Sequence, residues 1–265
     1  MAALCIAVIH GMGSQEKGYS LPMCGEINRR LGAAASKVEW EEIYWADILE
    51  KRERDYFTHA NAGNDLDWIK LRRFMLRAFG DASAYRKTDD PNNSAYHDIH
   101  ARVHESIVAL DDGTDTPLVV MAHSLGGHIM SSYIYDIQQG RSVVATGTSD
   151  FQQMKTLAGM ITFGCNIPFF TLAYRKSAIT PIRFPGDTLT PALKARAKWL
   201  NFYDPDDVLG YPLKAINKKY ERVVNADIPI NVGGMLSSWN PMSHQKYWTD
   251  NDFTRPVAGF IRGLL

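Results

Sequence analysis

Residues 118–127 read LVVMAHSLGG, an apolar run that leads directly to a serine among small residues. Such a run is typical of a strand buried on both faces of a sheet, and the residues after it have a helical composition. A sharp turn from strand to helix lifts the serine hydroxyl off the strand end, where a base can reach it. Ala122 and Gly126 are small enough for the chain to reverse there. The pattern predicts Ser124 as a nucleophile, and the alternative is a serine that only caps a helix.

Three other short segments occur where the same chemistry would need them. They are residues 10–13 (HGMG), 204–208 (DPDDV) and 243–245 (SHQ). The first two follow strand-like runs and the third lies in a predicted loop. Serine, acid and histidine therefore come in the chain order of one hydrolase architecture.

Apolar runs alternate with helical patterns along the chain, which predicts an α/β fold with a doubly wound, mostly parallel sheet of about six strands. The expected strands are 4–9, 38–44, 118–122, 160–164, 198–203 and 223–232. The expected helices are 21–35, 99–110, 125–138, 208–217 and 252–264. Ligands bind at the carboxyl ends of the strands in such sheets, so the four segments can converge there.

The composition describes one globular domain, residues 1–265, with a sizeable core, since 45% of the residues are hydrophobic. The 29 Lys and Arg residues balance 29 Asp and Glu residues. No net charge is therefore available to gather nucleic acid or an anionic membrane, and the expected partner is a small molecule.

The N-terminus and the cysteines predict a cytoplasmic protein. A core strand begins almost at once, without the basic and apolar regions of a signal peptide. Cys5, Cys24 and Cys165 are odd in number and form no C-x-x-C pair, which favours reduced core thiols over a disulfide framework. No run approaches the length of a membrane span, so any contact with a membrane is expected at its interface.

Two stretches, 46–93 and 166–195, do not fit the simple alternation and are predicted to form caps over the carboxyl edge of the sheet. The first contains an expected helix at 64–80, and the second is rich in proline and aromatic residues. We name Phe169 and Phe170 as candidate substrate-binding residues, because so many large apolar groups in a loop suit a pocket or a lipid surface. Trp68 is a third candidate, on the expected helix whose aromatic and basic residues would suit an anionic interface. The alternative is that both stretches only cover the edge of the sheet.

The four segments can supply an acyl-transfer site. Ser124 would attack an acyl carbonyl, and His244 would take its proton and later return one to the leaving group. An aspartate would hold the imidazole in the right tautomer. The backbone N–H groups of Met12 and Leu125 would form the oxyanion hole.

On residues 10–12, 122–127, 206–209 and 243–244 the chain resembles the α/β-hydrolases, nearest the serine esterases and lipases with a short His-Gly-x oxyanion loop. The resemblance implies an α/β-hydrolase fold without the family's leading antiparallel strands, because the His-Gly loop comes so early. It implies hydrolysis of a small-molecule or lipid carboxylic ester through an acyl-enzyme, with no cofactor and no metal. The alternatives are a thioester, an amide or a lipid acyl substrate on the same residues, and more distantly a non-catalytic binding protein.

The acid is the open assignment, because several aspartates follow the same predicted strand. Asp206 is favoured, since residues 206–212 resemble the Asp-Pro-Val-Pro segment of related lipases. Asp204 is the alternative, although an aspartate before proline often only shapes a turn. Asp187 is third.

The remaining histidines are predicted to be structural. His10 would tie down the oxyanion loop, and His123 and His128 would pack in or beside the elbow. Residues 97, 100 and 104 are histidines at helical spacing that could hold a metal. No nearby cysteine or His-Glu-x-x-His string accompanies them, so a solvated helix face is the favoured interpretation.

Overall fold

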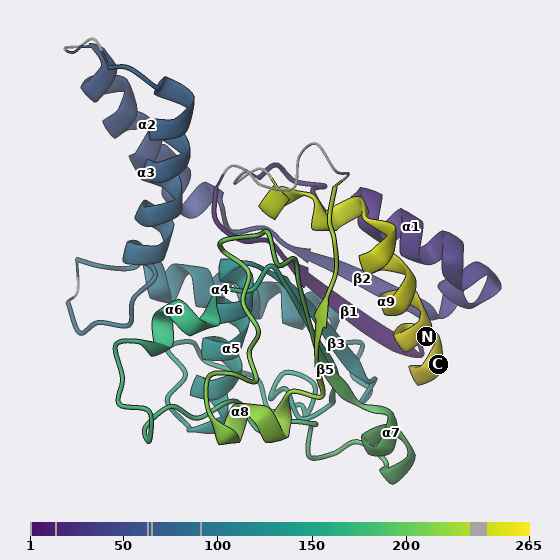
Figure 1. Ribbon diagram of the computed structural model, residues 1–265. Helices are drawn as coiled ribbons and strands as arrows, with labels where there is room; N and C mark the ends of the chain where they lie inside the picture. Colours follow the sequence, from purple (N-terminus) through teal and green to yellow (C-terminus); the bar gives the residue numbers. More distant parts are fainter. Residues whose placement is uncertain (1, 14, 63, 65, 91, 234–242) are drawn as a thin grey trace.

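The computed structural model describes residues 2–13, 15–62, 64, 66–90, 92–233 and 243–265. Its centre is a six-stranded sheet with the order β2-β1-β3-β4-β5-β6 (Figure 1). The strands are β1 (Leu4–Ile9), β2 (Val38–Ile43), β3 (Leu118–His123), β4 (Leu157–Phe163), β5 (Lys198–Tyr203) and β6 (Ala226–Pro229). Neighbouring strands pair in parallel throughout this order, which confirms the predicted α/β class and its parallel sheet.

Helices cover both faces of the sheet (Figure 1). The helices are α1 (Leu21–Leu31), α2 (Asp47–Ala62), α3 (Ile69–Ala84), α4 (Ala95–Leu110), α5 (Leu125–Gln138), α6 (Ile167–Thr171), α7 (Pro191–Arg196), α8 (Lys218–Val223) and α9 (Asn251–Leu264). Short 3₁₀ turns are η1 (Gly32–Lys37), η2 (Ser243–Gln245) and η3 (Tyr247–Thr249).

Side chains of the central strands alternate between two cores. In β1, Cys5, Ala7 and Ile9 pack in the core that contains α4 and α5. The alternate residues, Leu4, Ile6 and Val8, pack in the core that contains α1 and α9. All six residues are buried, which is why β1 reads as a continuous apolar run.

The strand order places a switch point between β1 and β3. From β1 the chain passes to β2 on one side, whereas β4, β5 and β6 follow β3 on the other side. Connections that leave in opposite directions open a crevice at the carboxyl ends of the two strands. Residues 10–13 follow β1 and Ser124 follows β3, so both lie at this crevice.

The predicted helix at 64–80 is wrong in its bounds. Two helices, α2 and α3, occupy the region, and α3 begins at Ile69 and continues through Gly80 to Ala84. The two helices pack against each other as a hairpin that stands out from the rest of the protein (Figure 1). A single glycine in a helix costs only about 1 kcal/mol. Packing against α2 offsets this cost, so α3 continues past Gly80.

The predicted helix at 208–217 is absent, and these described residues form turns instead. Pro212 has no N–H to donate, and carboxylates take nearby backbone donors. Asp207 accepts the N–H of Leu209, and Asp227 accepts the N–H groups of Leu213 and Lys214. The helix starts only at Lys218, after an Asn217 side chain that caps it. The strand expected at 223–232 is correspondingly shortened to β6.

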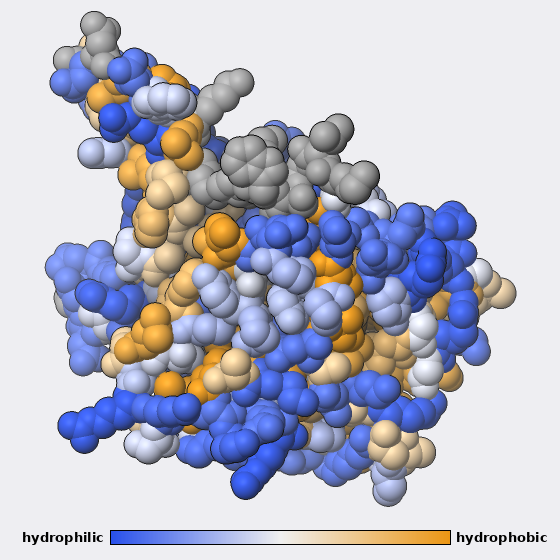
Figure 2. All heavy atoms as spheres, viewed as in Figure 1, coloured by the Kyte–Doolittle hydropathy of each residue, from blue (hydrophilic) through white to orange (hydrophobic). Residues whose placement is uncertain are grey.

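Large apolar side chains remain exposed on the hairpin and on α6. On the hairpin they include Trp68, Leu71, Met75 and Phe79, and Figure 2 shows hydrophobic residues along it. Within the described part of the chain, no helix has both the length and the apolar character needed to cross a membrane.

Candidate active site

Ser124 occupies a strained turn between β3 and α5. Its φ of 52° and ψ of −125° lie where residues other than glycine are rarely found. Two backbone bonds hold the turn: Ser124 N–H donates to the Phe163 carbonyl at 3.0 Å, and Gly127 N–H donates to the Ser124 carbonyl at 3.0 Å. The sharp strand-to-helix turn predicted from the sequence is therefore present.

Two glycines allow the β1 loop to pack directly on this turn. A Cβ built on Gly11 would lie 2.3 Å from the Cβ of Ser124, and one on Gly126 would lie 2.5 Å from the His10 carbonyl oxygen. Real Cβ atoms do not approach other heavy atoms so closely. The absence of a side chain at both positions brings the loop after β1 against the serine.

The Ser124 side chain makes no capping bond to α5. Its Oγ instead lies 2.7 Å from Nε2 of His244, and Nδ1 of His244 lies 2.8 Å from Oδ2 of Asp207. An ionised carboxylate can only accept, so Nδ1 carries the imidazole proton and Nε2 is left to accept from the serine hydroxyl. His244 can therefore take the proton of the Ser124 hydroxyl.

The Asp207 carboxylate is almost fully buried, with 2% of its side chain exposed. Burial alone would raise the pKa of Asp207. The hydrogen bond and charge of His244 outweigh burial, helped by the N–H of Leu209 and the hydroxyl of Tyr247, so the pKa lies below its ordinary value. Asp207 is therefore anionic at neutral pH and can stabilise a protonated His244.

Tyr247 supports the acid from η3. Its hydroxyl donates to Oδ2 of Asp207 at 2.9 Å and accepts the backbone N–H of Asp204 at 2.8 Å. The ring is fully buried. Nothing in a single sequence marks a tyrosine three residues after the histidine for this task.

The structure places Asp207, and not the predicted Asp206, beside His244. The backbone N–H of Asp206 bonds to Oδ1 of Asp204, and the Asp206 side chain is exposed. Asp204 is buried, and its Oδ2 accepts the backbone N–H of Val232 at 2.7 Å. Asp204 thus shapes the turn. The turn directs the carboxylate of Asp207 toward His244 and leaves Asp206 exposed.

His10 holds the loop after β1 in place. Its Nδ1 donates to the Gly11 carbonyl at 2.8 Å, and its Nε2 accepts the backbone N–H of Trp45 at 3.1 Å. The Trp45 indole donates to the His10 carbonyl and stacks on the imidazole at 4.9 Å. Burial lowers the pKa of His10 to about 4, so the ring is neutral at physiological pH. These contacts match the structural role predicted for His10.

The two predicted oxyanion donors lie next to the serine. Leu125 is the first residue of α5 and is fully buried, and its N–H has no acceptor within the helix. Met12 directly follows Gly11, which packs on Ser124. Its side chain is partly buried against the core.

His123 supports the segment that carries His244. The ring is fully buried, and Nε2 donates to the His244 backbone carbonyl at 2.8 Å. Burial lowers the pKa of His123 well below its ordinary value, which keeps it neutral. Its side chain therefore positions His244 through the backbone carbonyl of that residue.

Of the predicted substrate-binding residues, Phe169 and Phe170 lie together on α6, and Trp68 lies apart from them. Phe170 on α6 stacks on His128 at 3.9 Å, one helical turn beyond Ser124, and Phe169 meets the edge of Tyr211 at 4.9 Å. Trp68 lies just before α3, 13 residues before Asp81, or about 20 Å along a helix. Because Asp81 contacts the loop after β1, Trp68 is at the far end of the hairpin from the serine.

The histidines at 97, 100 and 104 do not form the predicted solvated helix face, because their side chains lie in different surroundings. His97 is exposed beside Asp98, whereas His100 is buried against the Tyr85 hydroxyl and His104 bonds to Tyr133. Across the residues with described positions, no group of three or more His, Cys, Asp or Glu side chains could hold a metal. Residues 5, 24 and 165 are buried free cysteines.

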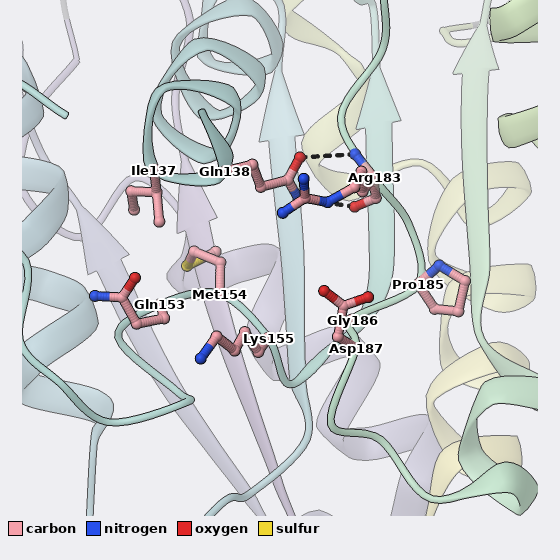
Figure 3. A pocket seen from close by; sticks show the side chains of 9 residues that line it. All are labelled: Ile137, Gln138, Gln153, Met154, Lys155, Arg183, Pro185, Gly186 and Asp187. Atoms are coloured by element: carbon pink, nitrogen blue, oxygen red, sulfur yellow. Dashed lines mark hydrogen bonds between the residues drawn. The ribbon is translucent and has the colours of Figure 1, made fainter. Parts of the chain in front are cut away.

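Asp187 lies in a turn at the other end of the sheet, near the start of β4. It lines a cavity of about 90 Å³ between the end of α5 and the start of β4 (Figure 3). There Gln138 accepts the N–H of Arg183 at 2.7 Å. Ser124 lies at the opposite, carboxyl ends of the strands, so Asp187 cannot pair with His244.

A scan against protein-family models and a search of curated proteins each find no match for this chain. Its function is therefore inferred from the geometry around Ser124.

Proposed function

We propose that this protein is a serine hydrolase that cleaves carboxylic esters. The observation that carries the proposal is the hydroxyl of Ser124 on a strained turn, 2.7 Å from Nε2 of a histidine whose other nitrogen bonds to a buried aspartate. A serine that only capped α5 would not need the strained backbone or the histidine. Such strain usually marks functional sites.

In the acylation step, Ser124 Oγ attacks the ester carbonyl carbon while His244 Nε2 takes the hydroxyl proton. Asp207 holds the imidazole in the required tautomer and stabilises its charged form. The tetrahedral intermediate collapses when the protonated histidine gives its proton to the alcohol oxygen, which leaves as the alcohol. An acyl group is then bonded to Ser124.

In the deacylation step, a water gives its proton to His244 as its oxygen attacks the acyl carbon. The C–O bond to Ser124 then breaks, the serine oxygen regains a proton from His244, and a carboxylic acid leaves. These steps use groups of this chain and water.

The N–H groups of Met12 and Leu125 are the proposed donors to the oxyanion in both steps. Donors of this kind act in a buried site where water does not compete, and losing one typically costs about 3 kcal/mol of barrier. Leu125 is at the N-terminus of α5, where the helix dipole adds positive potential.

The α/β-hydrolase fold is part of the same proposal. The parallel sheet, the turn at Ser124 and the order serine, acid, histidine along the chain support it. In that fold the nucleophile lies on a turn from strand to helix, and the serine, acid and histidine follow one another in this order along the chain. Other serine hydrolases have the three residues in different orders.

A fluorophosphonate probe tests the proposal directly, because it phosphonylates a serine only when a base activates the hydroxyl. We expect labelling at Ser124, located by mass spectrometry of the digested protein, and turnover of nitrophenyl esters. Nitroanilides and acyl thioesters of the same acyl groups, assayed in parallel, separate esters from the other acyl substrates.

Ser124→Ala is the control for both readouts, since it removes the hydroxyl and leaves the turn and its neighbours. Folded wild-type protein that neither reacts with the probe nor cleaves any of these substrates would contradict the proposal. Labelling at another serine would contradict the assignment of Ser124.

A further inference from the structure

A buried carboxyl group joins the α2–α3 hairpin to the loop after β1. Oδ2 of Asp81, in the last turn of α3, accepts the backbone N–H of Gly13 at 2.9 Å. The two residues are 68 positions apart in the sequence, and Asp81 is 4% exposed. A hydrogen bond that a backbone amide donates to a buried carboxyl oxygen fixes the orientation of that amide.

The bonded amide belongs to the peptide unit that follows the proposed oxyanion donor. The N–H of Gly13 shares one rigid plane with the carbonyl of Met12. Gly13 has a φ of +95°, a conformation that favours glycine. Once this plane is fixed, only the φ and ψ angles of Met12 still determine how its N–H is oriented.

The loop is held on the other side as well. His10 bonds to Trp45 through both its ring and its carbonyl, as described above. Met12 therefore lies between two anchors, one at His10 and one at Gly13. Both anchors come from outside the loop, and the Gly13 anchor comes from the hairpin.

The surroundings of Asp81 are unusual for a residue that only packs a helix. Burial raises the pKa of Asp81 above its ordinary value, the Gly13 hydrogen bond opposes this, and the charge of Glu53 on α2 adds to it. The guanidinium of Arg77 lies 3.8 Å from Glu53. One buried and one partly buried carboxyl group beside a single cation are costly to hold in place. An apolar side chain would pack α3 against α2 without that cost, but it could not accept from Gly13.

We propose that Asp81 is a positioning residue for the oxyanion loop, through which the α2–α3 hairpin sets the orientation of the Met12 N–H. The inference rests on the proposed hydrolase function. It gives the hairpin a role at the site although Trp68, at its far end, lies away from Ser124.

The test compares Asp81→Ala, which removes the acceptor, with Asp81→Asn, whose amide oxygen can still accept from Gly13. We expect Asp81→Ala to lower kcat on a nitrophenyl ester about 10- to 100-fold, with KM nearly unchanged. A loss of this size is typical when a group at the reacting centre is misplaced by about 1 Å. Asp81→Asn should restore most of kcat. Ser83→Ala, on the exposed side of the same turn, is the matched control and should behave as wild type.

Amide hydrogen exchange at Gly13 gives a readout that does not depend on activity. Exchange at Gly13 should be faster in Asp81→Ala and slow again in Asp81→Asn. If Asp81→Ala does not fold, Asp81→Leu provides the same loss of acceptor at nearly the size of asparagine. Circular dichroism and the melting temperature establish that each compared variant is folded.

Unchanged kcat in a folded Asp81→Ala or Asp81→Leu protein would overturn the inference, as would unchanged exchange at Gly13. A loss of kcat that Asp81→Asn does not restore would also overturn it. Failure of the proposed function itself is distinguishable, because the wild-type protein would then show neither ester turnover nor fluorophosphonate labelling.

Discussion

Nδ1 of His244 lies 2.8 Å from Oδ2 of Asp207, and both side chains are almost completely buried. A buried carboxylate paired with a histidine is costly to separate, because removing either partner leaves the other group desolvated and unpaired. The pair fixes which imidazole nitrogen faces Ser124.

Asp207→Asn should lower kcat for ester hydrolysis about 10⁴-fold, because the amide favours the wrong imidazole tautomer. Asp206→Asn, one residue earlier, is the matched control and should leave kcat close to wild type, since its side chain is exposed. Steady-state kinetics on one nitrophenyl ester checks both. A larger loss for Asp206→Asn than for Asp207→Asn would return the acid role to Asp206.

The aspartate that pairs with His244 could be predicted only in part from the sequence. The pattern after β5 narrows the acid to three aspartates within residues 204–207, because the strand end is clear. Which carboxylate turns toward His244 depends on the hydrogen bonds inside the turn, where Asp204 accepts from Asp206. Those bonds depend on backbone angles that the residue types alone do not determine.

Tyr247→Phe should reduce both stability and turnover. It removes the donor to Asp207 and leaves the Asp204 N–H without its acceptor in a buried site. Losing a hydrogen bond to a charged group costs about 1.5–3 kcal/mol, and kcat should fall by about tenfold as Asp207 loses support. Urea unfolding and ester kinetics measure the two effects. Wild-type stability and kcat together would show that the Tyr247 hydroxyl does not support the acid.

Gly11→Ala should nearly abolish turnover. Its new Cβ would lie 2.3 Å from the Cβ of Ser124, so either the loop or the serine must move. Overpacking of this kind costs about 1–3 kcal/mol of stability, and the displaced donor loop should lower kcat by about 100-fold or more. Gly259→Ala in α9 has open space around it and is the control, with unchanged kcat and equal or greater stability. Near-normal kcat in Gly11→Ala would contradict the close packing of loop and serine.

Predictions along the chain succeed where one pattern dominates. The bounds expected from the sequence are found in three elements, β1, β5 and α5. Strand-like runs mark the two strands, and the sharp turn at Ser124 marks the start of α5. The hairpin is different, since its second helix depends on α2 for packing and not on its own caps. The bond from Asp81 to Gly13 spans 68 residues and has no local signal at all.

Phe170→Ala should change the preference between short and long acyl esters, because Phe170 stacks on His128 one turn beyond Ser124. Trp68→Ala should leave this preference unchanged, since Trp68 lies at the far end of the hairpin. A series of nitrophenyl esters of increasing chain length, compared as kcat/KM, separates the two. An unchanged profile in Phe170→Ala, together with a marked fall in melting temperature, would show that Phe170 belongs to the core alone.

The buried His100 should make the protein less stable in acid. Burial, with smaller effects from nearby positive charges, lowers the pKa of His100 to about 3 from an ordinary value of 6.5. Between these two values the unfolded chain binds a proton on this imidazole and the folded protein does not, so acidification favours unfolding. His100→Gln cannot titrate, and its amide can still bond to the Tyr85 hydroxyl that His100 contacts at 2.7 Å. Melting temperatures from pH 7 to pH 4 should therefore fall more steeply for wild type than for His100→Gln, while His97→Gln, an exposed change on the same helix, should follow the wild-type curve. Parallel curves for wild type and His100→Gln would mean that the folded protein takes up this proton as readily as the unfolded chain.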